Sequence, residues 1–130
     1  IEARSSVYPA DTSATYRKPL FGQSQTMIIN HRTYTIVPRK MGPYLALVES
    51  HGLPVMLKHG FELMGYYVAK HGQLNQVIHI WKYDDMADLE TKRASRDADP
   101  AWGEYLAKTE GMVQYQEDRI MAPSSFSPDA

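Results

Sequence analysis

The chain has 130 residues with 14 basic and 15 acidic side chains and no cysteine. This balance of charge, without a basic block, argues against nucleic-acid binding and against a polybasic membrane contact. The absence of cysteine excludes disulfides, thiolate catalysis and Cys-based zinc sites, and no apolar run reaches the roughly 18 residues that a transmembrane helix needs. The size predicts one domain with its own core.

The first 25 residues hold two prolines and many small polar side chains without sustained periodicity. We therefore expect an irregular N-terminal extension over residues 1–25 and a folded domain over residues 26–128. The extension lacks the apolar core of a secretory signal. Together with the lack of cysteine, this leads us to expect a cytoplasmic protein.

The first predicted strand is Met27–Val37, which is rich in β-branched and aromatic residues. A helix is predicted to follow from about Met41, because apolar side chains recur there at helical spacing. Gly52 and Pro54 are expected to interrupt this helix, since glycine favours a helix C-cap and proline favours the first turn of a new helix.

Phe61–Ala69 and Leu74–Tyr83 are predicted to form a β-hairpin, because two strand-like segments flank a short glycine-containing turn. With an even number of loop residues, Met64 would lie opposite His79, and Tyr66 would share the sheet face of His79. An odd number would reverse this, because side-chain direction alternates along a strand.

The second strand of this hairpin is the strongest strand signal in the chain, and its two faces differ. One face carries Ile78 and Ile80, whereas the other carries His79, Trp81 and Tyr83. We expect the isoleucine face to contact the helices and the His-Trp-Tyr face to line a cavity or a partner subunit.

Helix caps mark the second half of the chain. Asp84 or Asp85 is expected to cap a helix that ends near Asp99, and Asp99 followed by Pro100 is expected to open a second, shorter helix. Capping explains these carboxylates better than an acidic ligand site does. The last predicted strand is Met112–Met121.

This order of elements, strand-helix-strand twice, predicts an α+β fold of the ferredoxin-like split βαβ type. Such a protomer has a four-stranded antiparallel sheet with helices on one face only. We expect the uncovered face to carry Tyr66, Trp81 and Tyr83. Because exposed aromatic patches of this size mark association surfaces, we expect a homodimer formed through this face.

Several short segments occur in a fixed order over about Met27 to Pro128. They are Arg32-Thr-Tyr-Thr-Ile36, Pro38-Arg-Lys40, Gly52-Leu-Pro54, Gly65-Tyr66, Leu74-Asn-Gln-Val77, His79-Ile-Trp81 with Tyr83, Asp99-Pro-Ala-Trp102 and Phe126-Ser-Pro128. This ordered set resembles the NIPSNAP family, and the chain looks like its small bacterial members. The resemblance implies a dimeric α+β barrel, in which two ferredoxin-like protomers pair sheet to sheet, and it points to no particular reaction. Arg39 departs from the family, which more often has glycine after this proline.

The candidate cavity-lining residues are Arg32, Tyr34, Tyr66, His79 and Trp81. His79 could donate, accept or transfer a proton near neutral pH, or it could be a hydrogen-bonded core histidine beside a core tryptophan. An inward-facing Arg32 would need an anionic ligand or an ion pair, for which Glu117 and Glu62 are the candidate partners.

No metal site and no cofactor are predicted. The five histidines include no pair at the helical spacing that metal ligands often use. The chain has no phosphate-binding glycine motif and no nucleophile motif, so catalytic residues stay unassigned.

Two functions remain open at this stage. The first is a dimeric small-molecule-binding or interaction module of the NIPSNAP type. The alternative is a cofactor-free enzyme, like a monooxygenase or an isomerase, that acts on a small aromatic compound. An open pocket that touches His79 and one of Arg32, Tyr34 or Tyr66 would favour the enzyme, and an interior filled with side chains would favour the module.

Overall fold

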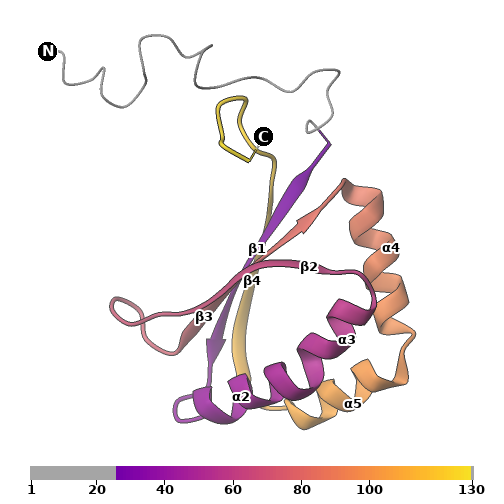
Figure 1. Cartoon of the computed structure of the whole chain (residues 1–130). Helices are drawn as coiled ribbons and strands as arrows, with labels where there is room; N and C mark the ends of the chain where they lie inside the picture. The colour runs from indigo at the N-terminus through magenta and orange to yellow at the C-terminus, as the bar shows by residue number, and fades with distance from the viewer. Residues whose placement is uncertain (1–25, 130) are drawn as a thin grey trace, which may run out of the picture.

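The computed structural model describes residues 26–129 and shows a sheet with the helices gathered on one side (Figure 1). The irregular extension that we expect over residues 1–25 lies outside the described residues. None of the described helices is long and apolar enough to cross a membrane.

The sheet has four antiparallel strands in the order β2-β3-β1-β4. These strands are β1 (Ile28–Ile36), β2 (Glu62–Val68), β3 (Gln76–Tyr83) and β4 (Val113–Met121). Their bounds lie within two residues of those predicted, and the order is that of a split βαβ protomer. The predicted α+β, ferredoxin-like fold is confirmed.

The helices form two crossovers, one between β1 and β2 and one between β3 and β4. They are α2 (Met41–Leu47), the π-helical turn η3 (Val48–Gly52), α3 (Leu53–Lys58), α4 (Met86–Asp97) and α5 (Pro100–Lys108). The predicted new helix with Pro54 in its first turn is present as α3, but the expected C-cap at Gly52 is not, because Gly52 keeps a helical φ of −72° and η3 leads directly into α3. Proline lacks an N–H group and fits the first turn of α3 without losing a hydrogen bond.

Side-chain caps begin both helices of the second crossover. Asp85 accepts a hydrogen bond from the backbone N–H of Asp88 at 2.7 Å, and Asp99 accepts one from Ala101 at 2.9 Å. The expectation that these carboxylates cap helices is therefore confirmed. In the turn after β1, Arg39 has a φ of +74°, a left-handed conformation that explains why glycine suits this position.

The predicted assignment of sheet faces is wrong. His79, Trp81 and Tyr83 lie beneath the helices, whereas Ile78 and Ile80 occupy the open face and are only partly buried. Aromatic side chains bury more apolar area than isoleucine does, so covering them with helices removes more surface from water. Trp81 is 3% exposed and belongs to a core cluster with Phe61, which rules out a dimer formed through the face of Trp81.

The hairpin register also differs from the prediction. Tyr66 lies opposite His79, and the register shifts between Leu63 and Gly65. The predicted pairing of Met64 with His79 is therefore wrong by two residues. A shift of two preserves side-chain direction, so the prediction that Tyr66 shares the face of His79 is confirmed.

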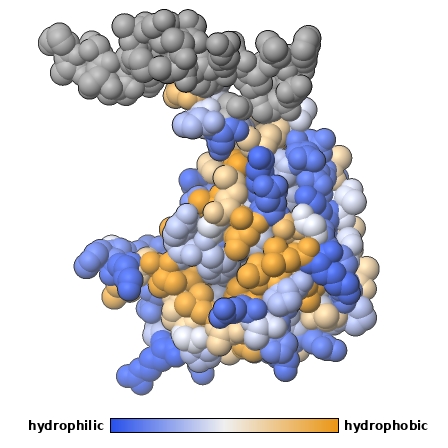
Figure 2. Space-filling view, in the orientation of Figure 1, coloured by the Kyte–Doolittle hydropathy of each residue, from blue (hydrophilic) through white to orange (hydrophobic). Residues whose placement is uncertain are grey.

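Apolar surface gathers over β2 and the adjoining part of α3 in Figure 2, where Leu57, Met64 and Val68 are exposed. Strand β2 is an edge strand in the described sheet. Exposed apolar side chains beside an unpaired strand edge favour contact with another chain.

The π-helical turn allows a close contact between the two helical crossovers. A Cβ atom on Gly52 would lie 2.7 Å from the ring of Tyr105, well inside van der Waals contact. We expect Gly52→Ala to lower the free energy of unfolding by about 1–3 kcal/mol, because either the helix or the Tyr105 ring must shift to admit the methyl group. Urea denaturation measures this.

Gly103→Ala is the matched control, since Gly103 also lies in a helix and its added Cβ would meet no atom within 4 Å. It should leave stability unchanged or raise it by up to about 1 kcal/mol through helix propensity. Equal effects of the two substitutions would show that the contact of Gly52 with Tyr105 is unimportant.

Candidate functional site

A cavity of about 120 Å³ lies between the sheet and the helices. Its wall is rich in aromatic side chains, and all four strands and all the described helices contribute residues to it. The aromatic and charged side chains on this wall are Tyr34, Tyr44, Tyr66, Tyr83, Tyr105, Trp81, Trp102, His79, Arg32, Arg93 and Arg96.

All five residues that the sequence singled out, Arg32, Tyr34, Tyr66, His79 and Trp81, lie on this wall. The structure therefore brings them together. Their cavity lies beneath the helices of one protomer, however, and not between two facing sheets as we expected. Strand pairing explains their proximity, because β1 and β2 both pair with β3 and present these side chains on the same face.

His79 is held in one tautomer by Trp81. The indole N–H of Trp81 donates a hydrogen bond to Nδ1 of His79 at 2.7 Å. Because the indole nitrogen is only a donor, Nδ1 must be unprotonated, and the neutral imidazole carries its proton on Nε2. Burial, together with the nearby charge of Arg32, lowers the pKa of His79 to about 3. The ring is therefore neutral at physiological pH.

The Nε2 atom of His79 is buried and has no hydrogen-bond partner within residues 26–129. The imidazole itself is firmly placed. The ring of Tyr66 stacks on it with centroids 4.6 Å apart, and Tyr34 meets it edge-on at the same distance. The site thus holds a fixed N–H donor without an acceptor, a costly arrangement in a protein interior.

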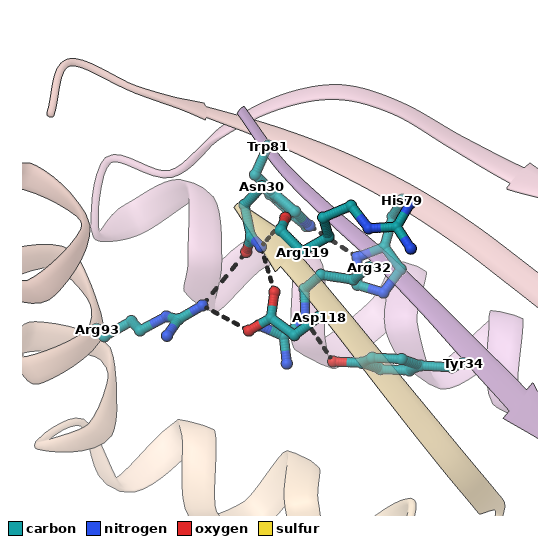
Figure 3. A network of polar contacts seen from close by, with 8 residues as sticks. All are labelled: Asn30, Arg32, Tyr34, His79, Trp81, Arg93, Asp118 and Arg119. Carbon is teal, nitrogen blue, oxygen red and sulfur yellow. Dashed lines mark hydrogen bonds and ion pairs between the residues drawn. The ribbon is translucent and has the colours of Figure 1, made fainter. Parts of the chain in front are cut away.

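Polar side chains at one end of the cavity converge on Asp118 of β4 (Figure 3). Arg32 donates to Oδ2 of Asp118 at 3.3 Å, and Arg93 reaches the same oxygen from α4 at 3.5 Å. Asn30, which is fully buried, donates to the other carboxylate oxygen. The Nε atom of Arg32 also donates to the hydroxyl oxygen of Tyr34 at 3.0 Å.

The predicted ion pair of Arg32 exists, but its predicted partners, Glu117 and Glu62, are wrong. Strand register decides this, because Asp118 lies directly opposite Arg32 on the helix-facing side of the sheet. Glu117 lies opposite Thr33 and therefore points to the open face.

Three tyrosines from different elements, Tyr44, Tyr66 and Tyr105, also line the cavity. Burial is the main cause that raises the pKa of Tyr44, Tyr66 and Tyr105 well above the usual value, although the hydrogen bond to Tyr44 acts to lower the pKa of Tyr66. All three phenols stay protonated at physiological pH. They supply hydroxyl groups that both donate and accept hydrogen bonds.

Sequence reasoning missed several wall and network residues, namely Asn30, Tyr44, Arg93, Tyr105 and Asp118. Asp118 could have been found by pairing the last strand with the first, since it aligns with Arg32. Arg93 lies four residues after the buried Leu89 and hence on the same side of its helix. Tyr44 and Tyr105 gave no signal beyond that of core residues.

Known proteins show the same domain. The NIPSNAP family profile matches residues 29–128. A NIPSNAP family protein of unknown function from Agrobacterium tumefaciens is 34% identical, with a TM-score of 0.75, over 80% of this chain and 94% of that chain. Human NipSnap homolog 3A is 33% identical over 91 residues, which are 68% of this chain.

The chain spans only part of the curated relatives that it matches, namely 36% of human NipSnap homolog 3A and 26% of NipSnap from Drosophila melanogaster. A more distant fold relative is a protein described as a putative antibiotic biosynthesis monooxygenase, from Bacteroides thetaiotaomicron. It has a TM-score of 0.58 and 23% identity over 77% of this chain and 91% of its own, and this likeness concerns the fold alone.

The family profile covers most of the chain, and the bacterial structure agrees with it in both sequence and fold. The chain belongs to the NIPSNAP family.

Proposed function

We propose that this protein binds a small planar molecule in the cavity between the sheet and the helices. The observation that carries the proposal is the buried Nε2–H of His79, a residue of the cavity wall, because no acceptor for it is found among residues 26–129. An unsatisfied buried donor costs roughly 1–3 kcal/mol, and a ligand that supplies an acceptor atom would remove this cost.

The size and chemistry of the cavity support this proposal. Its volume of about 120 Å³ is close to that of cavities, on the order of 150 Å³, that hold benzene. The rings of Tyr66, Trp81 and Tyr105 offer flat apolar surfaces, while few polar groups fix orientation. A single-ring compound with one polar substituent fits these features.

The state of His79 favours binding over proton abstraction. Its Nδ1 lone pair already accepts the indole N–H, its Nε2 already carries a proton, and its pKa of about 3 lies far below neutral pH. A general base works best when its pKa is near the operating pH. His79 is therefore a hydrogen-bond donor in this site.

The second candidate function is a cofactor-free enzyme that acts on a small aromatic compound. The open pocket beside His79, Arg32 and Tyr34 is the feature that we expected of an enzyme. A neutral imidazole N–H polarises a substrate carbonyl when it is held in a dry, preorganised site. Turnover of a bound probe, as opposed to its release unchanged, would distinguish this function from binding alone.

We also propose that the protein is a homodimer formed through the open face of the sheet. Ile78 and Ile80 are central on this face, and Tyr67 and Tyr115 are 57% and 59% exposed. These side chains replace the Trp81 face as the association surface. We further propose domain limits of 26–128 and a cytoplasmic location.

Ligand binding is tested with acetophenone and cumene, which have nearly the same shape and differ in the carbonyl acceptor. We expect the wild-type protein to bind acetophenone about tenfold more tightly by calorimetry, because only acetophenone accepts the Nε2–H bond of His79. In His79→Phe this preference should vanish while cumene still binds, which shows that the cavity persists. Equal affinities in the wild type would contradict the proposed role of His79.

The buried neutral state of His79 also predicts a dependence of stability on pH. Its pKa falls from 6.5 to about 3 on folding, so below pH 6.5 the unfolded chain binds a proton that the folded chain does not. Stability present above pH 6.5 is therefore lost as the pH falls towards 3, by up to about 1.4 kcal/mol per pH unit.

His79→Gln keeps an acceptor for Trp81 and removes this titration, so urea midpoints between pH 7 and pH 4 should vary less than in the wild type. His71→Gln, in an exposed turn, is the control and should follow the wild type. An unchanged pH slope in His79→Gln would contradict the assigned protonation state.

The dimer is tested by Ile78→Lys, which places a charge in the middle of the open face. We expect light scattering to show a dimer for the wild type and a monomer for this variant, since a stable interface buries at least about 1,000 Å² and excludes unpaired charges. Met86→Lys, on an exposed position of α4, should remain dimeric. A monomeric wild type at micromolar concentration would refute the dimer.

A further inference from the structure

The charges around the cavity are strongly one-sided. The charged side chains on its wall are Arg32, Arg93 and Arg96, and no carboxylate is on this wall in the described part of the chain. Asp118 contacts two of these arginines but stands beside the wall. The wall therefore carries a surplus of positive charge that is only partly balanced.

Asp118 neutralises the arginines only weakly, because it is a single carboxylate and because its contacts with them are long. One oxygen of Asp118 serves both Arg32, at 3.3 Å, and Arg93, at 3.5 Å, whereas strong charge-assisted bonds are about 2.7–2.9 Å long. The Asp118 side chain is also 38% exposed. Arg32 and Arg93 thus keep N–H groups for another anion.

Arg96 plays a different part, because its Nε atom pairs with Asp97 at 3.0 Å and its guanidinium lies 4.5 Å from the centre of the Trp102 ring. These contacts leave Arg32 and Arg93 as the pair available for a ligand.

Hydrogen-bond donors also outnumber acceptors here. The hydroxyl oxygen of Tyr34 accepts from Arg32, which leaves its own O–H proton to donate. The Nε2–H of His79 has no acceptor among residues 26–129, and His79 lies directly opposite Arg32 in the sheet. A carboxylate has two oxygens and about four lone-pair sites, which suits such a group of donors.

We propose that the natural ligand is a small aromatic carboxylate. Its ring occupies the aromatic part of the cavity, and its carboxylate lies between Arg32 and Arg93, within reach of the Nε2–H of His79. This inference rests on the proposed small-molecule-binding function and adds the charge and class of the ligand. An arginine pair binds a planar carboxylate with better geometry than the single shared oxygen of Asp118 provides.

The experiment compares benzoate with benzamide, which has the same shape and no charge. Calorimetry on the full chain at low salt should show benzoate binding about tenfold more tightly than benzamide, with the preference shrinking as salt is added. Arg93→Gln should abolish this preference, and Arg93→Lys should keep part of it. Arg119→Gln, on an exposed position of β4, is the control and should bind like the wild type.

The outcomes separate the two levels of the proposal. Benzamide binding as tightly as benzoate would overturn the carboxylate assignment and leave the small-molecule-binding function standing. Failure of both probes, together with acetophenone, would overturn both proposals. A benzoate preference that survives in a folded Arg93→Gln variant and falls in Arg119→Gln would place the anion on the open face and also overturn the inference.

Discussion

The hydrogen bond from Trp81 to His79 governs the chemistry of the cavity. It lies between two side chains of one strand, and Trp81 is held in place by edge-on packing against Phe61 at 6.0 Å. A core tryptophan thus fixes the tautomer of a wall histidine and leaves one N–H without a protein acceptor. Burial keeps this ring neutral, so the wall offers a donor and not a base.

Local features of the fold could be predicted from the sequence, because they depend on neighbouring residues. Asp85 and Asp99 cap helices through hydrogen bonds spanning two or three positions, and the strands follow from β-branched and aromatic residues. The covered face of the sheet was wrongly predicted. Both faces of β3 carry large apolar side chains. The helices cover the face whose side chains bury more apolar area, and the alternation of residues along the strand does not reveal which face that is.

The residues of the candidate site that lie on β1, β2 and β3 could be predicted from the sequence. The residues that contact them from other elements could not. Arg32 and His79 come from strands whose pairing could be foreseen, whereas Asp118 depends on the register of β4 against β1, which shifts at the end of β1. On the wall of the cavity, the ring of Tyr105 packs against Gly52 at the end of a π-helical turn. A turn of this kind has no reliable sequence signature, although such turns recur at functional sites.

The pleat of β3 places the residues proposed for ligand binding and those proposed for dimer formation on opposite faces of the sheet. His79 and Trp81 point to the cavity, while Ile78 and Ile80 point to the open face. A register slip of one residue would reverse every side chain, exposing Trp81 and placing the isoleucines beneath the helices. Trp81 would then leave Phe61, and the imidazole would lose its position between Tyr34 and Tyr66. The aromatic face therefore fixes the register, and that register gives one strand a ligand-binding side and an association side.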